Sequence, residues 1–265
     1  MYGAIAGDII GSRFEFNNIK TKTFRLFTKE CSFTDDTVMT VAVFDALFLH
    51  NSEMSDEEFK RILVDRMKYH GRKYPGAGYG SRFRNWLFTD TTEPYNSLGN
   101  GSAMRASGCA YAGDSLSEAL KFARLTAEVT HNHPEGIKGA EAVTAAMFLA
   151  KIGKKKEDIR KYIEENYYSL DFTLDEIREN YSFDVTCMGS VPQAIVAFLE
   201  AESYEDAIRN AISIGGDSDT IACITGGIAE TYFGVPEDIE KKAKSYLNEE
   251  MNNVICQFYS KYVLI

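Results

Sequence analysis

Two short clusters of carboxylate and hydroxyl side chains are the residues of this sequence best suited to chemistry. The first is FTDDT at residues 33–37, and the second is GGDSDT at residues 215–220. Magnesium and manganese ions prefer oxygen ligands from carboxylates, hydroxyls and water. Two clusters of this kind in one chain predict two halves of a single two-metal centre.

Each cluster also has a simpler interpretation, as a helix N-cap. Asp, Ser and Thr are preferred at N-caps because a side-chain oxygen accepts a bond from an unpaired backbone N–H. A cap needs only one such residue, whereas Asp35 and Asp36, and again Asp217 and Asp219, place two negative charges at one helix start. One cluster alone would suit a helix cap and a metal site equally well. The presence of both clusters favours metal binding.

Helical periodicity dominates the segments that must position these clusters, while strand patterns are sparse and no βαβ alternation is present. Pro134, Pro192 and Pro236 lie where helices are expected to begin, which suits proline in a first turn. The sequence therefore predicts a compact all-α protein with one domain over residues 1–265. We expect helices over residues 38–50, 81–88, 116–129, 136–152, 191–200, 204–212, 221–232 and 237–262.

Glycines mark two further features of the sequence. Gly3, Gly7 and Gly11 recur every four residues, which places them on one helix face and predicts close packing against another backbone. Residues 72–105 contain five glycines and few helical patterns. Long loops of this kind in a compact domain are usually functional or disordered, and the aromatic residues in this one argue against disorder.

Composition excludes several classes of protein. The chain has 265 residues with 29 Lys and Arg against 39 Asp and Glu, a net charge of −10, so the broad basic surface of a nucleic-acid-binding protein is not expected. Five widely spaced cysteines form no C-x-x-C pair, which disfavours a disulfide or zinc framework. The N-terminal residues lack a basic region, and Asp8 interrupts their apolar run, so we expect a cytoplasmic protein without a signal peptide or membrane span.

Five motifs in order resemble the ADP-ribosylglycohydrolase family, which includes dinitrogenase-reductase-activating glycohydrolase and the ADP-ribosyl-acceptor hydrolases. The motifs cover the chain from residue 1 to about residue 234 and are GAIAGD at 3–8, FTDDT at 33–37, GNGSAMR at 99–105, TH at 130–131 and GGDSDT at 215–220. The resemblance implies an orthogonal all-α bundle that holds two magnesium or manganese ions. It also implies hydrolysis of a glycosidic bond of ADP-ribose, a reaction in which paired metals activate water and carboxylates stabilise an oxocarbenium-like state.

The resemblance also implies roles for individual residues. One aspartate is expected to serve both metal ions, and Glu15 matches an acidic residue that contacts metal or substrate in some members. Either Asp36 or Glu15 could act as the catalytic base, and the sequence does not choose between them. The expected metal ligands are Thr34, Asp35, Asp36, Asp217, Asp219 and Thr220.

Further residues are expected to bind the substrate. The loop of residues 96–101 resembles the family's diphosphate-binding segment, His131 is expected near the diphosphate, and His133 is expected to be structural. Because Leu98 stands where some relatives have an aromatic residue, Tyr95, Tyr79 or Trp86 could stack on adenosine instead. Arg105 could pair with phosphate or anchor an acidic loop. The expected substrate-binding residues are Gly78, Tyr79, Asn96, Ser97, Leu98, Gly99, Asn100, Gly101 and His131.

Three functions remain open from the sequence. The first is hydrolysis of an ADP-ribose conjugate, with an ADP-ribosylated protein as one class of substrate and a monomer as the expected state. The second is a two-metal phosphohydrolase, because paired aspartates on magnesium also suit phosphoryl transfer. The third is a non-enzymatic role like that of the eye-lens crystallins of this family. The sequence does not identify the acceptor.

Overall fold

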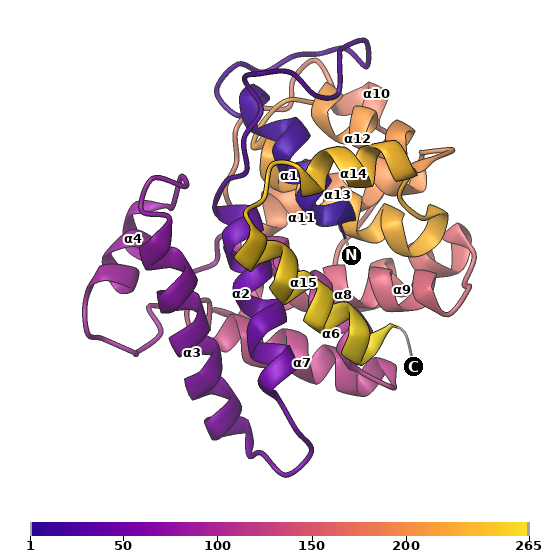
Figure 1. Ribbon diagram of the computed structural model, residues 1–265. Helices are drawn as coiled ribbons and strands as arrows, with labels where there is room; N and C mark the ends of the chain where they lie inside the picture. The colour runs from indigo at the N-terminus through magenta and orange to yellow at the C-terminus, as the bar shows by residue number, and fades with distance from the viewer. Residues whose placement is uncertain (1, 264–265) are drawn as a thin grey trace.

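A computed structural model describes residues 2–263, and within that range it contains helices and connecting turns but no β-strand (Figure 1). A lone bridge joins Gly99 to Thr186. The all-α class predicted from the sequence is therefore confirmed. The α-helices are α1 (Gly3–Gly11), α2 (Asp35–Leu49), α3 (Asp56–Lys73), α4 (Ser81–Phe88), α5 (Gly101–Met104), α6 (Cys109–Ala112), α7 (Leu116–Glu128), α8 (Pro134–Lys151), α9 (Lys156–Asn166), α10 (Leu174–Ile177), α11 (Cys187–Leu199), α12 (Tyr204–Ser213), α13 (Ser218–Phe233), α14 (Glu237–Lys244) and α15 (Glu249–Tyr262), with 3₁₀ turns η1 (Ser12–Phe14) and η2 (Ala106–Gly108).

Two expectations about helix extent need correction. The single helix expected over residues 237–262 is two helices, because the chain turns after Lys244 and Asn248 starts α15 by accepting a bond from the N–H of Met251 at 3.0 Å. Helix α3 was not among the expected helices. It begins with a capping box in which Ser55 and Glu58 bond to each other's backbone N–H, a signal that the sequence carries.

The three prolines occupy different positions. Pro134 is the first residue of α8, as predicted, and Pro236 immediately precedes α14. The expectation for Pro192 is wrong, because it lies inside α11. That helix begins earlier, at Cys187, where the hydroxyl of Thr186 caps it by accepting the N–H of Gly189 at 3.1 Å. Pro192 therefore lacks the N–H that other residues at this position of a helix donate.

Helices α1 and α13 lie against each other at backbone contact. A Cβ atom placed on Gly7 would lie 2.0 Å from the carbonyl oxygen of Ala222, and one on Gly3 would lie 2.5 Å from that of Gly226. A Cβ on Gly11 would lie 2.6 Å from the Cα of Asp219. The predicted packing role of these glycines is confirmed. It brings the Asp8 turn of α1 next to the first turn of α13.

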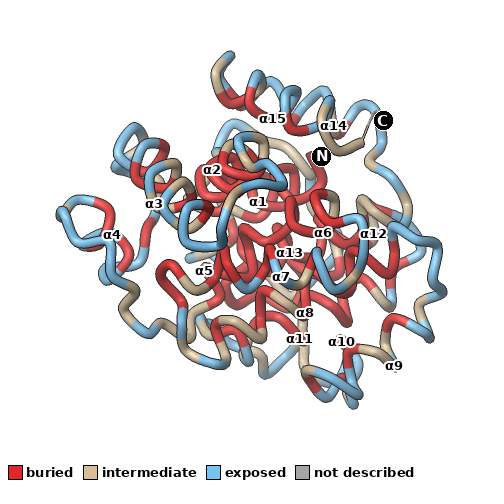
Figure 2. The backbone as a smooth tube through the Cα atoms, turned by 90° about the horizontal axis from the view of Figure 1, so that it is seen from below, coloured by how far each residue is buried: buried red, intermediate tan, exposed pale blue. Residues whose placement is uncertain are grey.

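Helix α13 forms the centre of the molecule and packs against α1, α8, α11 and α12. Figure 2 shows α1, α2 and α13 buried in the middle, with exposed backbone at the periphery. The apolar side chains form one continuous core cluster. Helix α3 packs on the outer side of α2, and α15 packs against α2 as well. None of the helices in the described range combines the length and apolar character needed to cross a bilayer.

Candidate metal centre

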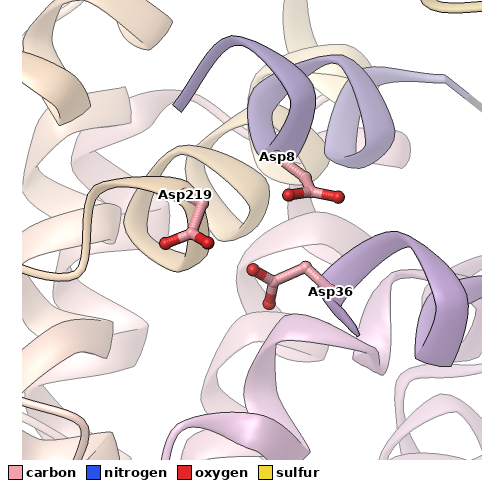
Figure 3. A group of neighbouring side chains, drawn as sticks. All are labelled: Asp8, Asp36 and Asp219. Carbon is pink, nitrogen blue, oxygen red and sulfur yellow. The ribbon is translucent and has the colours of Figure 1, made fainter. Parts of the chain in front are cut away.

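Three aspartates from three helices converge in the interior. Asp8 lies on α1, Asp36 lies in the first turn of α2, and Asp219 lies in the first turn of α13. One carboxylate oxygen of each lies within 4.8 Å of the others, and all three residues are buried. Figure 3 shows the three carboxylates directed toward one another. Close packing of α1 on α13 creates this convergence.

A second group of carboxylates adjoins the first. Oxygens of Glu15, Asp217 and Asp219 also lie within 4.8 Å of one another, with Glu15 only partly buried. Asp219 belongs to both groups. Two neighbouring groups that share one carboxylate could hold a pair of cations.

Asp8 is the member of the centre to which the sequence assigned no role. Its carboxylate accepts bonds from the backbone N–H and hydroxyl of Thr34 at 2.9 and 2.7 Å, and from the N–H of Thr37 at 3.1 Å. The hydroxyl of Thr37 bonds to it as well. The available signal was a charged residue inside the otherwise apolar segment GAIAGDIIG, all of which is buried.

The N-cap interpretation of the two clusters holds for one of them. The hydroxyl of Thr34 caps α2 by accepting the N–H of Asp36 at 3.3 Å. Asp217 stands at the N-cap of α13 but makes no side-chain cap bond. Its Oδ2 instead accepts a bond from Asn100 Nδ2 at 2.7 Å. The Asp217 carboxylate therefore serves the centre rather than the helix start.

Glycine geometry fixes the turn before α13. Gly215 and Gly216 have φ values of 70° and 76°, in the left-handed region where a side chain is strained. The ring of Tyr181 covers Gly216, because a Cβ there would lie 2.3 Å from a ring carbon. The pair of glycines in the GGDSDT motif is therefore required to direct Asp217 inward.

The remaining predicted ligands lie at the edge of the two groups. The hydroxyl of Thr220 donates to Asp36 at 3.1 Å. Asp35 belongs to neither group, and its N–H donates to the carbonyl of Ala77 at 2.7 Å. A Cβ on Gly78 would lie 3.3 Å from Asp35 Oδ1, so Gly78 lies beside this carboxylate.

Burial and mutual repulsion dominate the electrostatics of the centre. Burial, followed by the charges of Asp8 and Asp217, raises the pKa of Asp35 to about 8. Burial and the neighbouring carboxylates raise the pKa of Asp36 and of Asp219 well above the usual range of aspartate. Burial, with Asp217 and Asp8 next, raises the pKa of Glu15 to about 7. Bound cations would remove this repulsion.

The donor set fits a hard divalent cation. Every convergent group is a carboxylate, threonine hydroxyls lie alongside, and no histidine or cysteine belongs to either cluster. Asp219 Oδ1 is buried and has no hydrogen-bond partner. Because a buried polar atom without a partner is costly, this oxygen of a residue that belongs to both groups is well explained as a metal ligand.

The predicted substrate loop is held beside the centre by contacts with the segment before α8 and with α11. Asn96, at a positive φ of 53°, donates its N–H to Asn132 Oδ1 at 2.8 Å. The carbonyl of Leu98 accepts the N–H of Cys187 at 3.0 Å. A Cβ on Gly136 would lie 2.6 Å from the carbonyl oxygen of Ser97, so α8 begins directly against the loop.

His131 faces the glycines of this loop. Its Nε2 would lie 3.1 Å from a Cβ on Gly101 and 3.7 Å from one on Gly99. The hydroxyl of Thr130 lies 2.8 Å from His131 Nδ1 and accepts a bond from Arg105 at 2.7 Å. Because Arg105 is the donor to that oxygen, the hydroxyl proton is free to bond to Nδ1, which leaves the N–H of Nε2 directed at the loop.

Arg105 therefore differs from both roles expected for it. It is fully buried, and it donates to the carbonyl of Thr126 and the hydroxyl of Thr130 at 2.7 Å each. Within residues 2–263 it bonds to no acidic side chain, and its full burial leaves no guanidinium N–H exposed to a phosphate. Its guanidinium instead orients His131 through Thr130. Burial and the charge of Arg105 lower the pKa of His131 well below its usual range, which keeps the imidazole neutral.

Three other residues expected to contact the substrate make contacts inside the protein. Asn100 donates its backbone N–H to Val185 and its side-chain amide to Asp217 and Ser190, so none of its N–H groups is left for a phosphate. Tyr79 is buried, and its hydroxyl donates to Gly71. Trp86 is a core residue. Of the aromatic candidates for adenosine, only Tyr95 lies near His131, with ring centroids 5.9 Å apart.

His133 is structural, as expected. Its Nδ1 accepts the N–H of Glu135 at 3.1 Å and caps α8.

The family model described as ADP-ribosylglycohydrolase matches residues 1–261. The chain belongs to the ADP-ribosylglycohydrolase family. Among curated relatives, ADP-ribosylhydrolase ARH3 of Homo sapiens is 28% identical over 96% of this chain and 90% of its own length. ADP-ribosylarginine hydrolase Tri1 of Pseudomonas putida is 25% identical over 92% of this chain and 73% of its own length.

The fold agrees with this membership in the ADP-ribosylglycohydrolase family. A solved structure titled ADP-ribosylglycohydrolase-related protein complex superposes with a TM-score of 0.69 over 97% of this chain and 96% of the matched chain. At 20% identity that likeness shows the fold alone.

Proposed function

We propose that this protein is a metal-dependent hydrolase that cleaves the glycosidic bond between ADP-ribose and a modified acceptor, a protein side chain or a small conjugate. Asp219 carries the proposal, because it joins two groups of three carboxylates and has a buried oxygen without a partner. The names of the curated relatives ARH3 and Tri1 support ADP-ribose hydrolysis as the reaction class.

Two magnesium or manganese ions are the proposed cofactors. Asp8, Asp36 and Asp219 would hold one ion, and Glu15, Asp217 and Asp219 the other. The hydroxyls of Thr34 and Thr220 and the carboxylate of Asp35 lie at the margin and complete the proposed ligand set. Such a pair, when bound, orients ribose hydroxyls and supplies a nucleophile near neutral pH by lowering the pKa of water.

The protein's own groups divide the remaining work. Glu15 is the partly exposed member of the centre, which suits it to exchange a proton with solvent as the catalytic base. Asp36 is buried, and the hydroxyl of Thr220 lies within hydrogen-bond distance of both its carboxylate oxygens, which suits it to ligation rather than to proton transfer. The loop of residues 96–101, through groups other than the N–H groups of Asn100, and the N–H of His131 Nε2 would bind the diphosphate.

Analysis of products tests this function. The protein would be incubated with arginine-linked, serine-linked and acetyl-ester conjugates of ADP-ribose, with magnesium, manganese or EDTA, and the nucleotides resolved by chromatography. Release of free ADP-ribose that stops in EDTA is the expected result. Release of AMP or phosphate would instead indicate a phosphohydrolase, and no product from any conjugate would favour a non-enzymatic protein. The acceptor giving the highest kcat/KM would identify the linkage.

A further inference from the structure

Two phenylalanines form a stacked pair in solvent beside the metal centre. The side chains of Phe16 and Phe183 are 80% and 47% exposed, and their ring centroids lie 6.0 Å apart with planes at 24°. Phe16 is the most exposed of the large apolar residues in the described range. Single exposed apolar residues are normal on a protein surface, whereas a stacked pair drawn from two distant segments is a specific feature.

Both phenylalanines are close in sequence to residues of, or next to, the second group of carboxylates. Phe16 directly follows Glu15, which lies within 4.8 Å of Asp217 and Asp219 at their carboxylate oxygens. Phe183 lies two residues after Tyr181, whose ring covers Gly216, the residue before Asp217. Both rings therefore lie at the edge of the centre where Glu15 reaches solvent.

Lys20 joins the two segments, and Asn18 and Tyr181 each brace one of them. Lys20 Nζ donates to the carbonyls of Tyr181 and Ile214 at 2.7 and 2.6 Å. The amide of Asn18 bonds to both the N–H and the carbonyl of Gly216. The hydroxyl of Tyr181 donates to the carbonyl of Gly189 at 2.6 Å. Phe16 and Phe183 are thus presented by braced segments rather than by free loops.

We propose that Phe16 and Phe183 form an acceptor platform, a surface that receives an apolar or aromatic group next to the ADP-ribosylated atom. This inference rests on the proposed function. The platform lies at the carboxylates where the terminal ribose would be cleaved, so the bond to the acceptor leads out toward it. Adenine is the competing occupant, but in ADP-ribose the diphosphate separates adenine from the terminal ribose, and the loop of residues 96–101 is assigned to that diphosphate.

The chemistry of the platform selects against acidic acceptors. Phenyl rings offer flat apolar faces that stack on aromatic groups, and they provide no hydrogen bond or countercharge. Val185 and Met188 follow in the same segment as Phe183 and are 51% and 45% exposed, which extends its apolar character. An acceptor with a tyrosine, phenylalanine or leucine beside the modified residue fits this surface better than an acidic one.

Two ADP-ribosylated peptides with the same linkage test the platform. They differ only in the residue next to the modified one, phenylalanine in one and glycine in the other. The wild type should cleave the phenylalanine peptide with a kcat/KM about three- to tenfold higher, through a lower KM, as expected for one aromatic contact. Phe16→Ala and Phe183→Ala should cleave the two peptides with equal kcat/KM. Phe88→Ala, which removes a 45% exposed ring at the end of α4, should preserve the wild-type preference for the phenylalanine peptide.

Binding measurements distinguish a failure of the platform from a failure of the proposed function. The unmodified peptides would be titrated against wild type and variants by calorimetry in parallel with ADP-ribose. A weaker affinity for ADP-ribose in Phe16→Ala would show that the rings contact the nucleotide. If wild type and variants all had the same ratio of kcat/KM for the two peptides, the rings would contact neither the nucleotide nor the peptide. Each result overturns the platform. If the wild type released ADP-ribose from neither peptide, the proposed function would fail, and the peptide-binding preference alone would decide for or against the platform.

Discussion

Asn18 holds the backbone of Gly216 at both of its polar groups. Its Nδ2 donates to the Gly216 carbonyl at 2.9 Å, and its Oδ1 accepts the Gly216 N–H at 2.8 Å. The same amide nitrogen also donates to the carbonyl of Glu15 at 3.0 Å. One exposed asparagine thereby ties the segment that carries Glu15 to the turn that directs Asp217, and so aligns two of the three carboxylates of the second group.

Removal of this amide should loosen the second group of carboxylates. Asn18→Ala is expected to lower the affinity for manganese by about ten- to hundredfold, the usual effect of losing a residue that orients metal ligands. The fold should persist, because Asn18 lies at the surface. Calorimetric titration with manganese measures the change, and the exposed neighbour Asn17→Ala is the control. Equal affinities in both variants would contradict the orienting role.

Replacement of the shared carboxylate should separate catalysis from folding. Asp219→Asn is expected to abolish release of ADP-ribose and to raise the melting temperature of the metal-free protein, because it removes one of several mutually repelling charges. Melting curves in EDTA and turnover in magnesium provide the two measurements. Asp238→Asn on the exposed face of α14 is the matched control. A variant that is unfolded, or one as active as the wild type, would refute the assignment.

Metal binding should stabilise the wild type strongly. A ligand at a hundredfold excess over its Kd adds about 2.7 kcal/mol to the free energy of unfolding, which corresponds to roughly 5–10 °C in melting temperature for a chain of this size. Magnesium and manganese should therefore raise the Tm measured by calorimetry, and EDTA should reverse the change. Sodium chloride at equal ionic strength controls for general salt effects. A Tm unaffected by either proposed metal would argue against the centre.

The contact between α1 and α13 should tolerate no additional atom. Gly7→Ala places a methyl group 2.0 Å from the carbonyl oxygen of Ala222, and the helices must separate to admit it. We expect a loss of about 1–3 kcal/mol or more in unfolding free energy, measured with urea, together with weaker metal binding because Asp8 moves with α1. Gly76→Ala, with nothing within 4 Å of the added Cβ, should be nearly neutral.

The orientation of His131 should depend on a hydroxyl. Thr130→Val keeps the shape of the side chain but removes the oxygen that joins Arg105 to His131 Nδ1. We expect weaker ADP-ribose binding by about five- to tenfold, since one net hydrogen bond to the imidazole contributes about 1 kcal/mol. Titration with ADP-ribose tests this. Thr144→Val, at another buried threonine, should leave the affinity unchanged.

Much of the secondary structure could be predicted from the sequence because its determinants are local. Apolar periodicity located α4 at its observed bounds and α7, α12 and α13 within a few residues. The capping box at Ser55 and Glu58 was equally local and would have located α3. Local patterns did not reveal that Pro192 lies inside α11. Whether a helix begins before a proline depends on a cap such as Thr186 and on the packing of the rest of the helix.

The chemical character of the centre was likewise determined by the sequence, while its assembly was decided by tertiary structure. Carboxylates and hydroxyls beside a glycine pair predict a hard-cation site whatever the fold. The pairing of Asp36 with Thr220 joins positions 184 residues apart, and the inclusion of Asp8 requires that Gly7 let α1 approach the backbone of α13. Packing of distant segments likewise decided that Arg105 bonds to Thr130 rather than to an anion. Residue type and near neighbours determine what a side chain can do, but only packing of distant helices brings like charges together and leaves one buried oxygen without a partner.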